Sequence, residues 1–355
     1  MDIVGLMDTL GEANTKALAG LIVGTVFGVA AQRSQFCLRA SAVEFARGHI
    51  GPRTSVWLLT FATALFWTQF AIYFNYIDLT EARILAVPGS ISGAVIGGLM
   101  FGIGMVMARG CSGRLLVLAA TGNLRALISG LVFAVFAQMS LHGWLSPVRD
   151  YLAGLWVTPG GRNVNLLEAL GMPGGFGMLL GISFALYAIY IAYKNRVGYM
   201  VLFFGAGVGF SVALGWFATY TLASVSFEPT PIESLTSTGP SANTLMYFLE
   251  NSAIPTFAIG LVPGVFLGSF VTSQITRTYK CQGFEGARSM RRYLSGAALM
   301  GFGGMLAGGC AIGNGVTGTS VFSLTAWIAL FCFWVGAKIA DALLDNRTFR
   351  LATVA

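Results

Sequence analysis

Long apolar runs separated by short polar segments recur along the whole chain. Runs such as 56–73 and 254–275 reach the roughly 20 residues that a helix needs to cross about 30 Å of hydrocarbon. They do not alternate between apolar and polar side chains, as the strands of a membrane barrel do. The pattern predicts nine transmembrane helices, at 18–36, 55–76, 91–108, 124–141, 175–193, 199–220, 254–275, 294–309 and 322–343. We therefore expect an all-α integral membrane protein.

The composition excludes a water-soluble globule. Of the 355 residues, 55% are hydrophobic and only 10% are charged, which leaves too little polar surface to cover a soluble fold. An apolar stretch near the N-terminus loosely resembles a signal peptide, but the acidic residues Asp2, Asp8 and Glu12 precede it, where a signal peptide carries positive charge. We expect residues 1–355 to form a single transmembrane domain.

The basic residues are concentrated in alternate loops. Loops 32–54, 109–125, 194–198 and 276–293 carry lysines and arginines, whereas 221–253 carries three glutamates and no basic residue. Lys and Arg between membrane helices favour the cytoplasmic side, so the N-terminus is predicted to be periplasmic and the C-terminus cytoplasmic. The formal net charge of +7 then reflects topology, and we expect no nucleic-acid partner.

An internal repeat links the third and eighth predicted helices. Residues 97–111 and 296–310 share six of fifteen positions: Gly97, Gly102, Gly104, Ala108, Gly110 and Cys111. Because the two helices are five crossings apart, they run in opposite directions, which is typical of transporters with a site between inverted halves. We expect a first half at 18–141, a periplasmic connection at 142–174 and a second half at 175–343.

Each repeat ends in a glycine-rich turn, "GCSG" or "GCAIGNGVTG". Glycine lets a helix stop inside the membrane, and backbone freed in this way needs a polar cavity, so broken or re-entrant segments are expected at the centre. The N-terminal ends of the helices that follow attract anions. Close packing of helices on glycine is the alternative interpretation.

The same spacing recurs at a third cysteine, which stands nine residues after a glycine in the first predicted helix. A thiol among apolar side chains stays neutral, donates a weak hydrogen bond and is soft, so it favours a ligand with a terminal sulfur over one with oxygen alone. These features select three candidate substrate-binding residues: Cys37, Cys111 and Cys310. Cys332 is interpreted as a packing residue, and Cys281 as incidental.

The turns around these cysteines supply the other candidate residues. The remaining candidates for substrate binding are Gly110, Ser112, Gly113, Gly309, Asn314 and Thr317. Their polar groups either hydrogen-bond a ligand or cap helices. The nearby basic residues, which either set topology or hold an anion, are Arg33, Arg39, Arg109 and Arg114. Both pairs of alternatives stay open.

The segments "RSQFCLR", "ARGCSGRLL" and "AGGCAIGNG" resemble the cysteine motifs of the YeeE/YedE sulfur-transport family, and the resemblance extends over nearly the whole chain. It implies a bacterial inner-membrane transporter that takes up thiosulfate, with Cys37, Cys111 and Cys310 passing the anion along by S–H hydrogen bonds and no covalent change. A small cytoplasmic sulfurtransferase of the TusA type is an implied partner. Related members have been linked to selenium compounds or other sulfur species.

Other functions are less well supported. Membrane thiol-redox proteins typically carry a CxxC pair, and this sequence has none. A thiol-redox protein and a soft-metal transporter nevertheless stay open as alternatives. Neither histidine stands in the repeated motifs, so we expect no hydrolase activity, no enzyme of another kind and no cofactor. No acidic residue or histidine lies mid-span and no GxxxxGK[ST] motif is present, so we expect facilitated movement without proton coupling or ATP.

Overall fold

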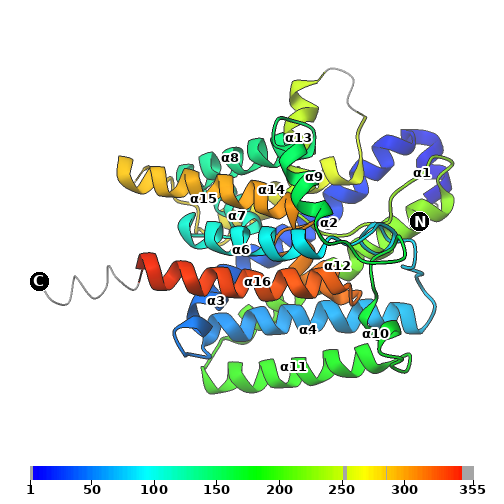
Figure 1. Cartoon of the computed structure of the whole chain (residues 1–355), viewed down its shortest axis with the longest axis horizontal. Helices are drawn as coiled ribbons and strands as arrows, with labels where there is room; N and C mark the ends of the chain where they lie inside the picture. The colour runs from blue at the N-terminus through cyan, green and yellow to red at the C-terminus, as the bar shows by residue number, and fades with distance from the viewer. Residues whose placement is uncertain (1–2, 251–253, 285, 346–355) are drawn as a thin grey trace, which may run out of the picture.

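The computed structural model describes residues 3–250, 254–284 and 286–345. It is a bundle of long helices whose axes run in a common direction (Figure 1). The long helices are α2 (Glu12–Ser34), α4 (Pro52–Tyr73), α6 (Ile91–Met107), α8 (Leu124–Leu141), α11 (Phe176–Lys194), α12 (Tyr199–Val225), α14 (Phe257–Ile275), α15 (Ala287–Leu306) and α16 (Leu324–Ala340). The described residues include isolated β-bridges but no strand, so the all-α prediction is confirmed.

Shorter helices lie between the long ones and at the ends of the bundle. They are α1 (Ile3–Leu10), α3 (Leu38–Ala46), α5 (Arg83–Ala86), α7 (Ser112–Ala120), α9 (Ser146–Gly154), α10 (Leu166–Ala169) and α13 (Thr238–Leu249), with the π-helical segments η1 (Gly313–Gly318) and η2 (Asp341–Asp345). Figure 1 places α3 and η2 at one end of the bundle and α1 and α10 at the other. We refer to these two ends as the α3 face and the α10 face.

Eight helical segments in the described part of the chain are long and apolar enough to cross a membrane. They make the protein a multi-pass membrane protein. α15, which corresponds to the crossing expected at 294–309, is not among the eight because arginines in its first turns lower its mean hydropathy. It nevertheless packs along α6 and α8, and a ninth crossing stays a prediction.

Reciprocal glycine contacts join α6 to α15. A Cβ atom placed on Gly97 would lie 2.5 Å from the carbonyl oxygen of Gly303, and one placed on Gly104 would lie 2.6 Å from that of Gly296. In the sequence repeat, Gly97 corresponds to Gly296 and Gly104 to Gly303. Gly97 therefore contacts the counterpart of Gly104, and Gly104 contacts the counterpart of Gly97. Helix backbones approach this closely only where the interface residues are small. These glycines therefore serve close packing in the middle of the helices.

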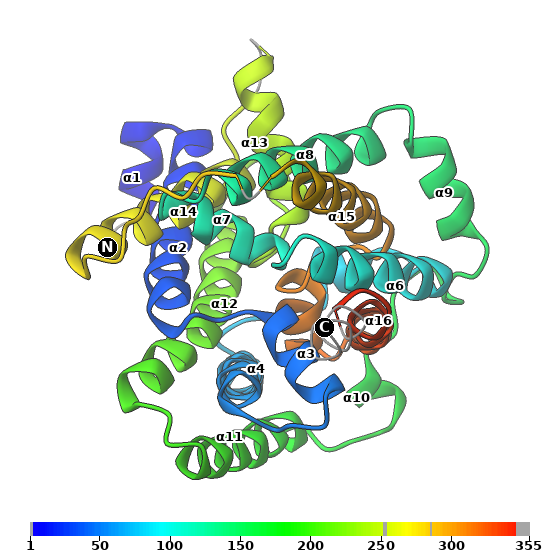
Figure 2. The ribbon, with the colours of Figure 1, turned by 90° about the vertical axis from the view of Figure 1, so that its left-hand side faces the viewer.

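Figure 2 looks down the bundle and shows α15, α16 and α4 end on. Helix α2 packs along α14 and α12 along α4, while α6 packs along α16 and α15 along α8. At the α3 face, Arg47 donates two hydrogen bonds to the buried carboxylate of Asp341, at 2.9 and 2.8 Å. This ion pair fastens the end of α3 to the end of α16.

Two segments assigned to loops by the hydropathy pattern lie inside the protein. Helix α7 fills much of the expected loop 109–125. Residues 232–237, part of the loop expected at 221–253, fold back between the helices, where the Ser234 hydroxyl donates to the carbonyl of Val212 at 2.6 Å. The Thr219 hydroxyl donates to the carbonyl of Glu233 at 2.6 Å. Hydroxyl groups thus satisfy backbone that an apolar segment would leave unpaired, which is why a polar stretch can enter the core.

Candidate functional site

The backbone before each of the three candidate cysteines has the same conformation. Each stands two residues after a residue in the left-handed conformation that ends a long helix: Gln35 (φ 53°), Arg109 (φ 56°) and Gly308 (φ 78°). Such a residue closes the last helical turn and reverses the chain. The two repeat turns match in detail, since the preceding residues, Ala108 and Ala307, both have φ −75° and ψ −4°.

A new helical segment begins just after each cysteine, as predicted. Cys37 directly precedes α3, and Cys111 directly precedes α7. After Cys310, the carbonyl of that residue accepts a hydrogen bond from the N–H of Asn314 at 2.8 Å, and η1 follows. The sulfur atoms therefore lie where a helix ends and another begins, next to N–H groups that have no partner within their own helix.

The Cys310 sulfur is surrounded by hydrogen-bond donors. It accepts from the Ser237 hydroxyl at 3.1 Å, from the Ser237 N–H at 3.3 Å and from the Gly313 N–H at 3.3 Å. The hydroxyl of Thr236 lies 3.7 Å away. Cys310 has no exposed surface. Polar groups from two segments, 236–237 and 313, therefore surround this buried sulfur.

Ser237 connects this cysteine to the other repeat turn. Its hydroxyl lies 2.7 Å from that of Ser112, the residue directly after Cys111. Gly113, the next residue, contacts the side chain of Ile312, and a Cβ atom there would collide with it. The two repeat turns therefore meet at the centre of the protein, with Ser237 between them.

Cys37 and Cys111 form a second pair. The two thiols are close enough to interact electrostatically, and so are those of Cys111 and Cys310. Cys111 is fully buried, whereas Cys37 is partly exposed. The guanidinium of Arg114, on the first turn of α7, lies beside both thiols. The structure thus brings together all three cysteines that the repeat and the glycine spacing selected.

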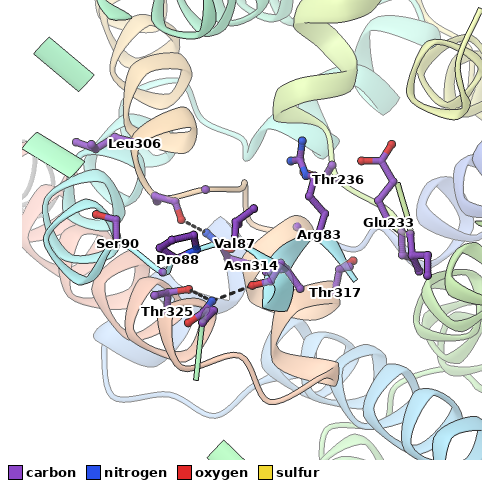
Figure 3. Close-up of a pocket in the computed structure, with 18 of the residues that line it drawn as sticks. Arg83, Val87, Pro88, Ser90, Glu233, Thr236, Leu306, Asn314, Thr317 and Thr325 are labelled. Atoms are coloured by element: carbon purple, nitrogen blue, oxygen red, sulfur yellow. Dashed lines mark hydrogen bonds between the residues drawn. The ribbon is translucent and has the colours of Figure 1, made fainter. Parts of the chain in front are cut away.

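A cavity of about 340 Å³ lies on the α10 side of Cys310, and Figure 3 shows residues that line it. Thr236 and Gly313, which both contact the Cys310 sulfur, form part of its wall. The remaining polar lining includes Arg83, Ser90, Asn163, Glu233, Asn314, Thr317 and Thr325. A small anion inside it would meet amide, hydroxyl and guanidinium donors before it reached the thiol.

A second cavity, of about 650 Å³, lies at the α3 face. Its basic side chains are Arg39, Arg47, His49 and Arg53, and Glu44 is its acidic one. It begins two residues after Cys37, at the first turn of α3. The two cavities therefore approach the group of three cysteines from opposite ends of the bundle.

The other predicted site residues adjoin this group. Asn314 and Thr317 line the cavity at the α10 face, but they also hold the turn: the Asn314 amide donates to the carbonyls of Ala307 and Gly309 at 2.8 and 3.1 Å. The Thr317 hydroxyl donates to the carbonyl of Leu235 at 2.6 Å. Gly110 lies in the turn before Cys111, where its N–H donates to the carbonyl of Met105 at 3.0 Å.

The remaining cysteines lie elsewhere. Cys332 is buried in α16, where its Cβ would meet a Cβ placed on Gly98. Cys281 is exposed. Across residues 3–250, 254–284 and 286–345, no group of three or more His, Cys, Asp or Glu side chains is placed to hold a metal ion.

Reasoning from the sequence missed the residues contributed by 226–237 and by the loops of the α10 face. Thr236 and Ser237 contact Cys310 directly, while Arg83, Asn163 and Glu233 line the cavity. The available signal was the hydroxyl-rich stretch "SLTSTGP" at 234–240. Ser and Thr are common just before a helix, and the stretch lies outside the repeat, so this signal did not single out the residues.

The membrane-spanning helices break at a buried polar centre, and a cavity lies on each side of that centre. This architecture is typical of a membrane transporter rather than an enzyme. The family model described as sulphur transport matches residues 33–339. The chain therefore belongs to the YeeE/YedE sulfur-transport family, as the motifs predicted.

Similar proteins include two that are named thiosulfate transporter TsuA. The one from Spirochaeta thermophila is 26% identical over 336 residues, covering 89% of this chain and 96% of that protein. The one from Escherichia coli is 24% identical over 375 aligned positions, covering 95% of this chain and 98% of that protein. A probable transporter, YedE of Escherichia coli, is 26% identical over 181 residues, covering 50% of this chain and 41% of that protein.

Proposed function

We propose that this protein takes up thiosulfate, or a closely related sulfur-containing anion, across the bacterial inner membrane. Two relatives that carry the name thiosulfate transporter align with 89% and 95% of this chain. The observation that carries the proposal is the position of the Cys310 sulfur. It lies directly behind Thr236 at the end of a polar cavity, and Ser237 links it to the turn that holds Cys111.

The path runs from the α10 face to the α3 face. The anion enters the cavity, where polar donors replace part of its hydration. At Cys310 the thiol donates its S–H to the terminal sulfur of the anion, and Cys111 and Cys37 then do the same in turn. A soft sulfur acceptor suits a soft thiol, and the substrate crosses without any covalent bond being formed or broken.

The fully buried thiols of Cys310 and Cys111 require a local movement during transport. The wall between the cavity and Cys310 consists of Thr236 and the first residue of η1, Gly313. A π-helical segment often marks a functional site. The segment after Cys310 is the π-helical η1, whereas the corresponding segment after Cys111, α7, is an ordinary α-helix. Displacement of Thr236 or of η1 admits the anion to the sulfur.

The two halves are related as inverted repeats. In this relationship the helices of the first half, α2, α4, α6 and α8, correspond in order to α12, α14, α15 and α16 of the second half. The packing of α2 on α14 is then equivalent to the packing of α12 on α4. The packing of α6 on α16 is equivalent to that of α15 on α8. The reciprocal contacts between Gly97 and Gly303 and between Gly104 and Gly296 support the same relationship.

The α3 face is cytoplasmic and the α10 face periplasmic. Arginines around α3 and in the first turns of α15 support this orientation, since short cytoplasmic loops are rich in Lys and Arg. Exposed apolar side chains such as Leu186, Phe203 and Phe331 face lipid. The basic cavity at the α3 face suits an acidic patch on a small cytoplasmic sulfurtransferase of the TusA type that receives the sulfur.

Purified protein in vesicles that contain no other protein tests this function. Thiosulfate labelled in its outer sulfur should enter and equilibrate, with unlabelled thiosulfate competing and sulfate competing poorly. Accumulation above equilibrium under an imposed proton gradient would contradict facilitated movement. Failure of thiosulfate uptake, with uptake of a selenium analogue or of Cu(I) by the same vesicles, would reassign the substrate.

A further inference from the structure

The four arginines near the cysteines differ sharply in their surroundings. The Arg33 guanidinium lies over the ring of Phe204, 5.5 Å from its centroid. The Arg39 guanidinium lies 3.6 Å from the carboxylate of Asp345. Arg109 lies over the ring of Tyr293, 5.9 Å from its centroid. These three have partners that account for their positions, through charge pairing or cation–π contact.

Arg114 has no such partner among the residues that the structure describes. Its Nη1 atom is buried and, within the part of the chain that the structure describes, makes no hydrogen bond. No carboxylate in that part forms an ion pair with it. Another cation, Arg53, is close enough for the two positive charges to repel each other, and it donates to the side chain of Gln35 at 2.9 Å. Two positive charges are therefore concentrated beside the inner cysteines.

A buried charged donor without an acceptor is costly. Arg114 nevertheless lies in the first turn of α7, beside the thiols of Cys37 and Cys111. The N-terminal end of a helix adds partial positive charge at the same place. Among the described residues no carboxylate pairs with the guanidinium and its Nη1 has no acceptor, so an oxyanion at this place would satisfy it.

We propose that Arg114, Cys37 and Cys111 form an inner anion-binding site, in which the guanidinium holds the oxygens of the substrate and the two thiols face its terminal sulfur. This inference rests on the proposed function. A guanidinium presents N–H groups in a fork that matches two oxygens of one oxyanion. The site therefore recognises both ends of an anion that carries oxygen at one end and soft sulfur at the other.

The arrangement has a consequence for selectivity. Sulfate offers oxygens to Arg114 but no soft sulfur to the thiols, whereas thiocyanate, a monovalent anion, offers sulfur but no oxygens to the guanidinium. Thiosulfate satisfies both parts. Removal of the guanidinium should therefore weaken thiosulfate binding strongly and reduce the preference for thiosulfate over thiocyanate.

The test compares wild type with Arg114→Gln, Arg114→Lys and the control Arg125→Gln. Arg125 lies on the same predicted cytoplasmic loop, over the ring of Tyr293 at 4.7 Å from its centroid, so its substitution removes the same topological charge outside the site. Two quantities are measured for each variant: thiosulfate uptake into vesicles as a function of concentration, and stabilisation of the purified protein by thiosulfate in thermal unfolding. Thiocyanate is the competing anion.

We expect Arg114→Gln to raise the half-saturating thiosulfate concentration at least about tenfold in both measurements, as loss of a charge-assisted hydrogen bond does. Arg114→Lys should recover part of the loss, and Arg125→Gln should behave as wild type. Unchanged binding in Arg114→Gln, while wild type transports thiosulfate, would overturn the inner site and leave the proposed function intact. Folded wild-type protein that neither binds nor transports thiosulfate would overturn both.

Discussion

The hydroxyl oxygens of Ser112 and Ser237 lie 2.7 Å apart, although the two residues belong to different halves of the chain. Ser112 follows Cys111, and Ser237 donates to the sulfur of Cys310 at 3.1 Å. One short chain of polar groups therefore joins the turns of the two repeats. In the proposed path, the substrate therefore moves between the two cysteines along hydroxyl groups and does not cross an entirely apolar layer.

Ser237→Ala should lower thiosulfate uptake about thirtyfold without unfolding the protein, because the hydroxyl makes two hydrogen bonds and each is worth about 1 kcal/mol. Ser241→Ala, one turn further along α13, provides the matched control, since Ser241 is outside this chain of polar groups. Initial uptake rates at equal membrane abundance make the comparison. Equal rates for Ser237→Ala and wild type would mean that Ser237 only supports the fold.

Gly97→Ala should lower the thermal stability of the purified protein. A Cβ atom at Gly97 would lie 2.5 Å from the Gly303 carbonyl oxygen and 2.6 Å from the Ala307 N, and overpacking of this kind costs about 1–3 kcal/mol. Gly130→Ala, in α8, has no atom within 4 Å of the added Cβ and should be neutral or slightly stabilising. Thermal unfolding in detergent gives both values. If both variants unfold at the wild-type temperature, the α6–α15 contact is looser than described.

Thiosulfate uptake should increase as the external pH is lowered from neutral into the acidic range. Burial raises the pKa of the Glu233 carboxyl above its ordinary value, although the nearby Arg83 guanidinium opposes the shift. A raised pKa means that Glu233 gains its proton at a higher pH than an exposed glutamate does. The neutral form no longer repels an anion in the cavity that Glu233 lines.

Glu233→Gln should therefore give high uptake that varies little with pH, while Glu228→Gln, an exposed residue of the same segment, should keep the wild-type profile. The measurement is the initial uptake rate against external pH, with the internal pH held constant. A Glu233→Gln profile that rises on acidification as steeply as wild type would assign the pH dependence to another group.

The sequence was sufficient to predict the two cysteine turns of the repeat. Cys111 and Cys310 follow the same glycine spacing, and glycine spacing reports where helices can pack closely and stop. The turn at Cys37 was recognised from the same spacing, even though the residue that reverses the chain there is Gln35 (φ 53°) rather than glycine. Local pattern alone therefore located the three cysteine turns that the structure brings together.

The contribution of Ser237 could not be predicted from local pattern. Hydropathy assigns a polar segment to the surface, because it carries no information about hydrogen-bond partners from distant helices. Ser234, which donates to the Val212 carbonyl, enters the core only because that partner is present. The difference between Arg114 and Arg109 has the same origin, since the ring of Tyr293 that lies beneath Arg109 belongs to a helix far along the chain.

The central claim is that the cysteines form the transport path, and uptake by three alanine variants tests it most directly. Cells that lack other sulfur importers receive wild type, Cys111→Ala, Cys310→Ala or Cys332→Ala at equal membrane abundance, and the uptake of thiosulfate labelled in its outer sulfur is measured. We predict that uptake falls at least about tenfold in the first two variants and stays near normal in Cys332→Ala. Normal uptake by all three variants would contradict the account and leave the cysteines as packing residues.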